Sequence, residues 1–335
     1  MKVNSQRDIS FKSIYTNKAL KKGLELAADN GALFAASTIL TMSMFARPAA
    51  IWLAPHTDKE NKKFACAKSI ASSVAGYLIT LGISTPIAKS IKKIDKNPEK
   101  YLKPTTIEYL KDAGKGLYES KAYTFSTQLF KLGAGILTAI PKALLTAAWL
   151  PIVMHHLFKK KPTENNKSNN LTFKGKNDRL ANQIGKIIDK EGMKTFSTKY
   201  KDSNFPMHIV AATDALTTAT FIHQTNNSKQ IDENRKKALI YNAGISTGLS
   251  IISSYIIDRA LKKPTENFIK AFEKANKGMP NLKKQVEGIK IAKPIIIVGT
   301  VYYMFIPFIS TFLAEKADKN PKLDLHKKII NNVII

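Results

Sequence analysis

The sequence predicts an all-α protein, a polytopic helical membrane bundle of about six helices. The first observation behind this prediction is that residues 69–88, 238–257 and 294–314 contain no charged side chain. As a helix, each of these stretches would be roughly 30 Å long, which is the thickness of the hydrocarbon core of a bilayer. The second observation is that Lys-rich stretches followed by Pro end several of the apolar segments, as expected where helices leave a membrane.

Three further apolar segments each contain one charged residue. Residues 31–55 include Arg47, residues 132–158 include Lys142, and residues 205–225 include Asp214. With the three charge-free stretches they give six candidate spans. The alternative is a soluble helical protein whose central helices are buried on all sides, because residues 69–88 and 238–257 are rich in Ser, Thr, Gly and Asn.

The charge of the chain indicates a membrane surface rather than nucleic acid. The 335 residues include 53 Lys and Arg against 25 Asp and Glu, a formal charge of +28, and only five of the basic residues are Arg. Lys lacks the planar fork with which Arg binds bases and phosphates, which disfavours a nucleic-acid partner. Lys-rich helix ends instead suit anionic lipid head groups, which we expect as the partner. The six-span arrangement places 25 Lys and Arg on one side and 26 on the other, which leaves the orientation undetermined.

Internal similarity predicts two related halves. Ala71 and Ala75 stand in a small-xxx-small pattern, and Gly244 and Gly248 repeat it 173 residues later. Such patterns let helices approach closely, so these four residues are candidates for helix packing. The predicted organisation is a basic N-terminal segment, a first helical half, a Lys/Asn-rich linker with a short amphipathic helix, a second helical half and a C-terminal tail, at residues 1–22, 23–162, 163–204, 205–322 and 323–335. Three spans per half is an odd number, so we expect the halves to have inverted orientation.

No catalytic or cofactor motif is present in the sequence. There is no nucleotide-binding glycine loop, zinc-protease helix or nucleophile elbow. Cys66 is the single cysteine, which excludes an internal disulfide and any cysteine-based metal cluster. The six His do not share a helix stripe. We therefore expect no enzyme activity, no cofactor and no metal.

The three charged residues within apolar segments form a candidate intramembrane polar site. A charge inside a membrane is costly unless it is paired or faces water, so Asp214 paired with Arg47 or Lys142 would leave one positive charge for a small anion. The alternative is that these residues lie at the membrane interface, where long side chains reach water.

These observations favour an integral membrane protein with a non-enzymatic structural or interaction role. The second hypothesis is a small-solute, or anion, carrier with a midplane site between the two halves. The third is a soluble basic helical protein that binds nucleic acid. The sequence predicts a multi-pass membrane location and identifies no cargo.

Overall fold

A computed structural model describes residues 14–53, 59–112, 114, 116–158, 177–228 and 233–307 of the chain. Every regular element among these residues is a helix, so the all-α prediction is confirmed. The ends of the predicted first and last segments, and residues 159–176 of the predicted linker region, lie outside the described residues.

The described part of the first half contains one hairpin of long helices and a third long helix. Its elements are α2 (Lys18–Asp29), α3 (Gly31–Met44), α4 (Ala46–Trp52), α5 (Lys59–Lys96), α6 (Pro98–Tyr101), α7 (Pro104–Leu110), the 3₁₀ turn η1 (Leu117–Glu119) and α8 (Lys121–Phe158). Asn17 and Asn30 cap α2 and α3, because each side-chain oxygen accepts backbone N–H groups of the first turn.

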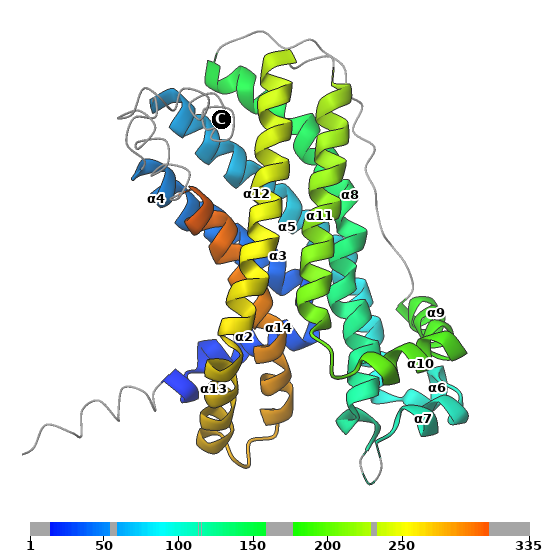
Figure 1. Cartoon of the computed structure of the whole chain (residues 1–335). Coiled ribbons are helices and arrows are strands. Elements are labelled where there is room, and N and C mark those ends of the chain that lie inside the picture. The colour runs from blue at the N-terminus through cyan, green and yellow to red at the C-terminus, as the bar shows by residue number, and fades with distance from the viewer. Residues whose placement is uncertain are drawn as a thin grey trace, which may run out of the picture.

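The predicted linker contains α9 (Asn177–Ile188) and α10 (Glu191–Tyr200). The described part of the second half contains α11 (Phe205–Asn227), α12 (Glu233–Ala260), α13 (Lys262–Ala275), α14 (Leu282–Thr300) and the π-helical turn η2 (Val301–Phe305). Figure 1 shows α11 and α12 side by side, with α13 below them.

Four helical stretches among the described residues are long and apolar enough to cross a membrane. They are Gly31–Trp52, Ser69–Lys96, Lys121–Thr146 and Leu282–Phe305. The last begins at Leu282 and not at Pro294, because Pro294 lies inside α14. The helices α11 and α12 exist where spans were expected but are not among these four stretches, so a bundle of six spans is not confirmed.

The two halves run in the same direction, which corrects the inverted arrangement expected from the sequence. Phe125 of α8 packs on Phe205 of α11, and further along both helices Gly135 of α8 faces Thr213 of α11. The residue numbers increase in the same direction in both helices, so α8 and α11 are parallel. In the same way Gly31 lies against Ile291 and Met42 against Gly299, so α3 and α14 are parallel. Phe158, where α8 ends, and Asn177, where α9 begins, therefore lie at opposite ends of the bundle (Figure 1).

The end of the molecule that carries α6, α7, α9 and α10 has an ordinary apolar core. Ile91, Leu110, Tyr123 and Ile188 are among its buried residues. The predicted short amphipathic helix of the linker is α9, and it packs so tightly on this core that a Cβ on Gly185 would meet the Tyr101 carbonyl oxygen at 2.2 Å. Amphipathic helices that bury their apolar face in this way are typical of protein in contact with water.

The long helices in the other part of the molecule have the opposite distribution of side chains. In α12 the exposed large side chains form one stripe, Tyr241, Ile245, Leu249, Ile252 and Ile256. The opposite face buries Thr247, Ser250 and Ser254, and Ile252 is 61% exposed while Ser254 is fully buried. In α5, Leu78 and Leu81 are likewise exposed while Thr80 and Ser84 are buried. In α5 and α12, therefore, hydroxyl groups lie on the buried face and large apolar side chains on the exposed face.

The parallel direction of α8 and α11 can be tested by cross-linking. In a chain with Cys66 replaced, the pair Phe125→Cys and Phe205→Cys and the pair Gly135→Cys and Thr213→Cys should both react with a short bifunctional thiol reagent, because both pairs are in contact. The measurement is the gel mobility of the cross-linked chain. A mismatched pair, Phe125→Cys and Thr213→Cys, should remain unlinked; inverted halves would reverse this pattern.

Candidate functional site

One cavity of about 310 Å³ is lined by α3 together with α4, and by α5, α8, α11, α12 and α14. Its wall includes small and apolar residues of α3, such as Ala32 and Ala36, and of α14, such as Val298. The polar side chains that line it come from α4, α5, α8, α11, α12 and η2. They are Arg47, Ser69, Ser72, Ser73, Tyr77, Lys142, Thr146, Thr213, Asp214, Thr217, Thr218, Thr247, Tyr302 and Tyr303. The three charged residues singled out in the sequence are thus brought to the same cavity from α4, α8 and α11.

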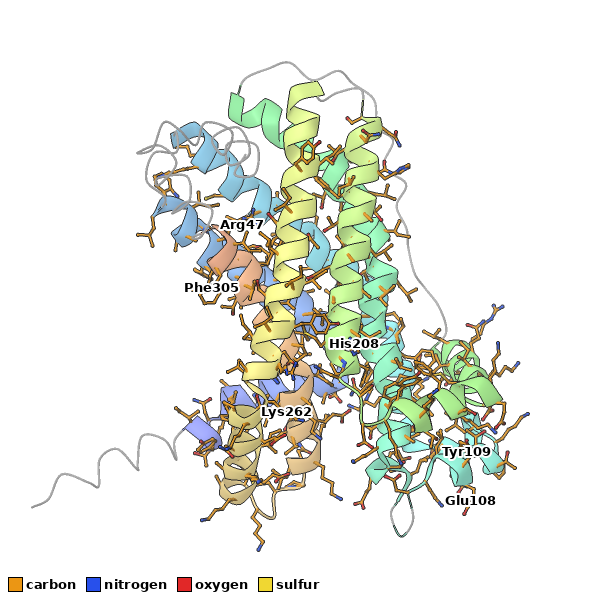
Figure 2. The ribbon with its side chains drawn as sticks, in the orientation of Figure 1. Arg47, Glu108, Tyr109, His208, Lys262 and Phe305 are labelled. Carbon is orange, nitrogen blue, oxygen red and sulfur yellow. The ribbon has the colours of Figure 1, made fainter. Side chains whose placement is uncertain are left out.

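Arg47 lies at one end of the cavity and is held by aromatic rings. Its guanidinium carbon is 5.5 Å from the Tyr302 ring centroid and 5.7 Å from that of Tyr303. Figure 2 shows Arg47 close to Phe305, where η2 ends. Cation–π contacts fix the plane of the guanidinium without satisfying its N–H donors. The Arg47 Nε is buried and has no hydrogen-bond partner among the described residues, so it is available to an acceptor in the cavity.

Tyr302 and Tyr303 both lie in the π-helical turn Val301–Phe305, and their rings lie edge to face with centroids 5.0 Å apart. Short π-helical turns are frequent at functional sites. Both rings meet Arg47, a contact that no pattern in the sequence predicted.

Lys142 and Asp214 line the same cavity and attract each other electrostatically. Each is largely removed from solvent, and each is the opposite charge that acts on the other. They do not approach within 4.0 Å, so among the described residues neither belongs to a direct ion pair. The stem of Lys142 lies over Gly76 of α5, where an added Cβ would meet its methylene carbons at 3.6–3.7 Å. These are ordinary van der Waals distances, so the Lys142 stem packs along Gly76 between α5 and α8.

The hydroxyl groups of α11 are arranged in two ways. Thr213 and Thr217 donate to carbonyl oxygens one turn earlier in their own helix, at 2.8 and 2.7 Å. Thr218 instead bonds Thr247 of α12 at 2.8 Å. Because a hydroxyl has one proton and two lone pairs, Thr213 and Thr217 keep only acceptor lone pairs, whereas the Thr218–Thr247 pair keeps one of its two protons to donate.

The four candidate helix-packing residues are separated in the structure. Ala75 is buried and Ala71 is partly buried in α5, which packs mainly on α8 and α3. A Cβ on Gly244 would meet Ile222 of α11 at 3.8 Å, and one on Gly248 would meet nothing within 4 Å. The second small-xxx-small pattern therefore lies beside α11 and does not face the first.

The described residues contain no group of three or more His, Cys, Asp or Glu that could hold a metal ion. His208 instead bonds the Tyr255 hydroxyl at 2.6 Å and His223 contacts Asn227. The cavity has two cationic groups, one carboxylate and many hydroxyls. With all three ionised its formal charge is +1, which suits a small ligand of net negative charge.

Comparison with known proteins identifies no relative, since no protein-family model, no curated protein sequence and no solved structure matches this chain.

The coupling between Lys142 and Asp214 predicts a specific result in a double-mutant cycle. Asp214→Asn leaves the Lys142 ammonium without the opposite charge that acts on it, and Lys142→Met does the same to the Asp214 carboxylate. Each single variant should therefore lower the free energy of unfolding, and the double variant should cost less than the sum by about 0.5–3 kcal/mol, the range for coupled residues. The measurement is reversible unfolding of the purified protein in detergent.

A matched pair on the surface provides the control for this cycle. Lys283 and Glu119 form an exposed ion pair between α14 and η1, and exposed pairs contribute about 0–1 kcal/mol. Equal, additive losses for both pairs would contradict an electrostatic interaction across the cavity.

Proposed function

We propose that this protein is an integral membrane protein with a non-enzymatic role, which binds a small anionic solute in the cavity between its long helices. The single observation that carries the proposal is that Arg47, Lys142 and Asp214, from three separate helices, line that one cavity.

The location of bulky apolar side chains supports the membrane part of this proposal. In water, exposing the stripe of α12 while burying its Ser and Thr residues would be unfavourable on both faces. In lipid, both preferences reverse, because hydrocarbon replaces water outside and hydroxyl groups find partners between helices. Phe45 and Leu53, near the ends of α4, are also strongly exposed, at 70% and 75%. Lys262 and Lys263, where α12 ends, are placed to meet anionic lipid head groups.

The parallel direction of α8 and α11 limits where lipid can lie. Phe158 and Asn177 lie at opposite ends of the bundle, and the sequence that joins them includes six Lys and four Asn, a composition that does not dissolve in hydrocarbon. We therefore expect one side of the bundle to be free of lipid. The outward residues of α11 include His208, Ala212, Ala215, Ala219 and His223, and no large apolar side chain of this fully described helix is exposed. We propose that lipid contacts the exposed apolar faces of α3, α5, α8, α12 and α14, and that the face of α11 does not meet lipid.

The chemistry of the cavity supports an anionic ligand. A guanidinium with a free, buried N–H and an ammonium on a separate helix offer charge-assisted hydrogen bonds from two directions, while the Asp214 carboxylate compensates one of the two charges. The hydroxyls of α5, α11 and α12 can orient a polar ligand that has several oxygen atoms. The proposed ligand class is a small carboxylate or phosphate.

A charge on the outward face of α12 tests the membrane location. Ile252→Lys should cost about 3 kcal/mol when lipid surrounds this residue, because a lysine in mid-membrane must reach water or thin the bilayer. In water the same change would be close to neutral, since the side chain is already 61% exposed. The measurement is the free energy of unfolding in lipid bicelles, together with the fraction of protein retained by membranes after alkaline extraction.

The matched control for this variant is Ala212→Lys on α11. His208 pairs with Tyr255 and Thr218 with Thr247, so Ala212 and Ile252 lie at about the same level on adjacent antiparallel helices. Ala212→Lys should have little effect if the face of α11 is free of lipid. Equal losses for both variants would contradict the uneven lipid contact, and no loss for either would contradict the membrane location itself.

Ligand binding is tested with sodium phosphate and sodium succinate as anionic probes and choline chloride as the cationic probe. A saturating anion should stabilise the purified native protein, by about 2.7 kcal/mol at one hundred times its dissociation constant. The stabilisation should disappear in Arg47→Gln and in Lys142→Met, because each removes a donor from the cavity. The measurement is the shift of the thermal midpoint against anion concentration.

Lys283→Met, which removes a lysine far from the cavity, serves as the control and should keep the full response. If neither anion raises the midpoint of the native protein more than that of Arg47→Gln, the anion site is contradicted. Uptake of the stabilising anion by proteoliposomes then separates a carrier from a binding protein.

A further inference from the structure

A second buried polar cluster lies about one helical turn from the cavity, toward the end that carries α13. It is formed by Gln128 and Lys131 of α8, Glu287 of α14 and Asp95 of α5. Leu132, the residue after Lys131, lines the cavity wall. Neither the proposed ligand site nor the apolar core uses these four side chains.

The contacts of the cluster leave one carboxylate without a close cation. The Lys131 Nζ is 3.8 Å from Asp95 Oδ2, and the Tyr123 hydroxyl donates to Asp95 Oδ1 at 2.7 Å. Glu287 receives one hydrogen bond, from Gln128 Nε2 at 2.5 Å. If both acids are ionised, two carboxylates share the single ammonium of Lys131, and the cluster has a net charge of −1 in a place where charge is poorly solvated.

The amide of Gln128 provides an independent observation. Gln128 is 1% exposed, and its Nε2 donates both to Glu287 and to the Ala28 carbonyl oxygen at 2.7 Å. Its Oε1 is buried and has no hydrogen-bond partner among the described residues. A buried acceptor left unsatisfied costs about 1–3 kcal/mol. A proton on the second oxygen of Glu287 would supply the missing donor, because an amide and a carboxylic acid can exchange two hydrogen bonds.

We propose that Glu287 and Gln128 form a proton-binding site, in which the neutral carboxylic acid of Glu287 pairs with the Gln128 amide. This inference goes beyond anion binding and does not depend on it. In the protonated state Lys131 remains with Asp95. In the deprotonated state the Glu287 carboxylate competes with Asp95 for Lys131, so the contact between α8 and α14 changes beside the cavity wall.

The other charged and titratable groups around Glu287 are already engaged. Asp29 of α2 pairs with Lys284 of α14 at 2.6 Å, and Glu25 accepts from Gln285 at 2.8 Å. Tyr123 of α8 bonds Asp95, and Tyr118 packs edge to face on Tyr123. Asp29 and Asp95 both repel a charge on Glu287, and Lys131 attracts it. A proton therefore relieves two repulsions together with the unsatisfied amide oxygen.

The test is infrared difference spectroscopy of the purified full chain in lipid, titrated from mildly acidic to mildly alkaline pH. We expect one protonated-carboxyl band that disappears on titration and that shifts when the glutamates are labelled with ¹³C at the carboxyl carbon. The band should be lost in Glu287→Gln and retained in Glu25→Gln, the control on α2. In Gln128→Met the band should move to higher frequency, because its carbonyl loses the amide donor.

Two results would overturn the proposal. One is the absence of any titrating carboxyl band in the native protein. The other is a band that does not respond to ¹³C-glutamate or that persists in Glu287→Gln, which would assign the proton to another acid such as Asp95. The isotope experiment uses the unmodified sequence and separates a glutamate from an aspartate even if Glu287→Gln does not fold, and the frequency shift in Gln128→Met then identifies that glutamate as the partner of the Gln128 amide.

Discussion

The structure depends on one constraint: where the long helices meet, polar groups lie between them and large aliphatic groups lie outside. Arg47, Lys142 and Asp214 cannot be moved outward without exposing charge to the surface that Leu78 and Ile252 occupy. Keeping them inside requires a cavity, because charged groups without direct ion pairs need space for a polar partner. The cavity is thus a consequence of the same side-chain distribution that suits the outer surface to lipid.

The end that carries α6, α7, α9 and α10 buries its apolar side chains, as proteins in water do. Single long helices pass from this end into the part of the bundle where large apolar side chains are exposed. In α5 the exposed apolar residues Leu78 and Leu81 precede the buried Ile91 and Ile94, so the helix changes from one regime to the other within about three turns. In α14 this change coincides with Glu287 and Pro294, between the apolar core around Phe272 and the cavity. Buried polar clusters at such a boundary are reached from water more easily than those inside the cavity.

The sequence was sufficient for the helical class, for the positions of most long helices and for the three charged residues of the cavity, because each of these is a local property of charge and hydropathy. It was insufficient for the direction of the second half, since an odd span count assumes that consecutive long helices alternate in direction, and the contacts of Phe125 with Phe205 and of Gly135 with Thr213 show that α8 and α11 are parallel. It also missed Tyr302 and Tyr303 as partners of Arg47, because no α-helical spacing rule predicts the π-helical turn in which both tyrosines lie.

Gly31 lies where the cavity wall meets the turns that carry the Glu287 cluster. A Cβ at Gly31 would meet Leu132 at 3.1 Å and Ile291 at 3.3 Å, so α3 lies close to α8 and α14 at this level. Leu132 lines the cavity and follows Lys131, and Ile291 lies one turn after Glu287. A change in the pairing of Lys131 would therefore occur next to the two side chains against which α3 packs. The proposed proton site and this part of the cavity wall thus share the same turns of the same two helices.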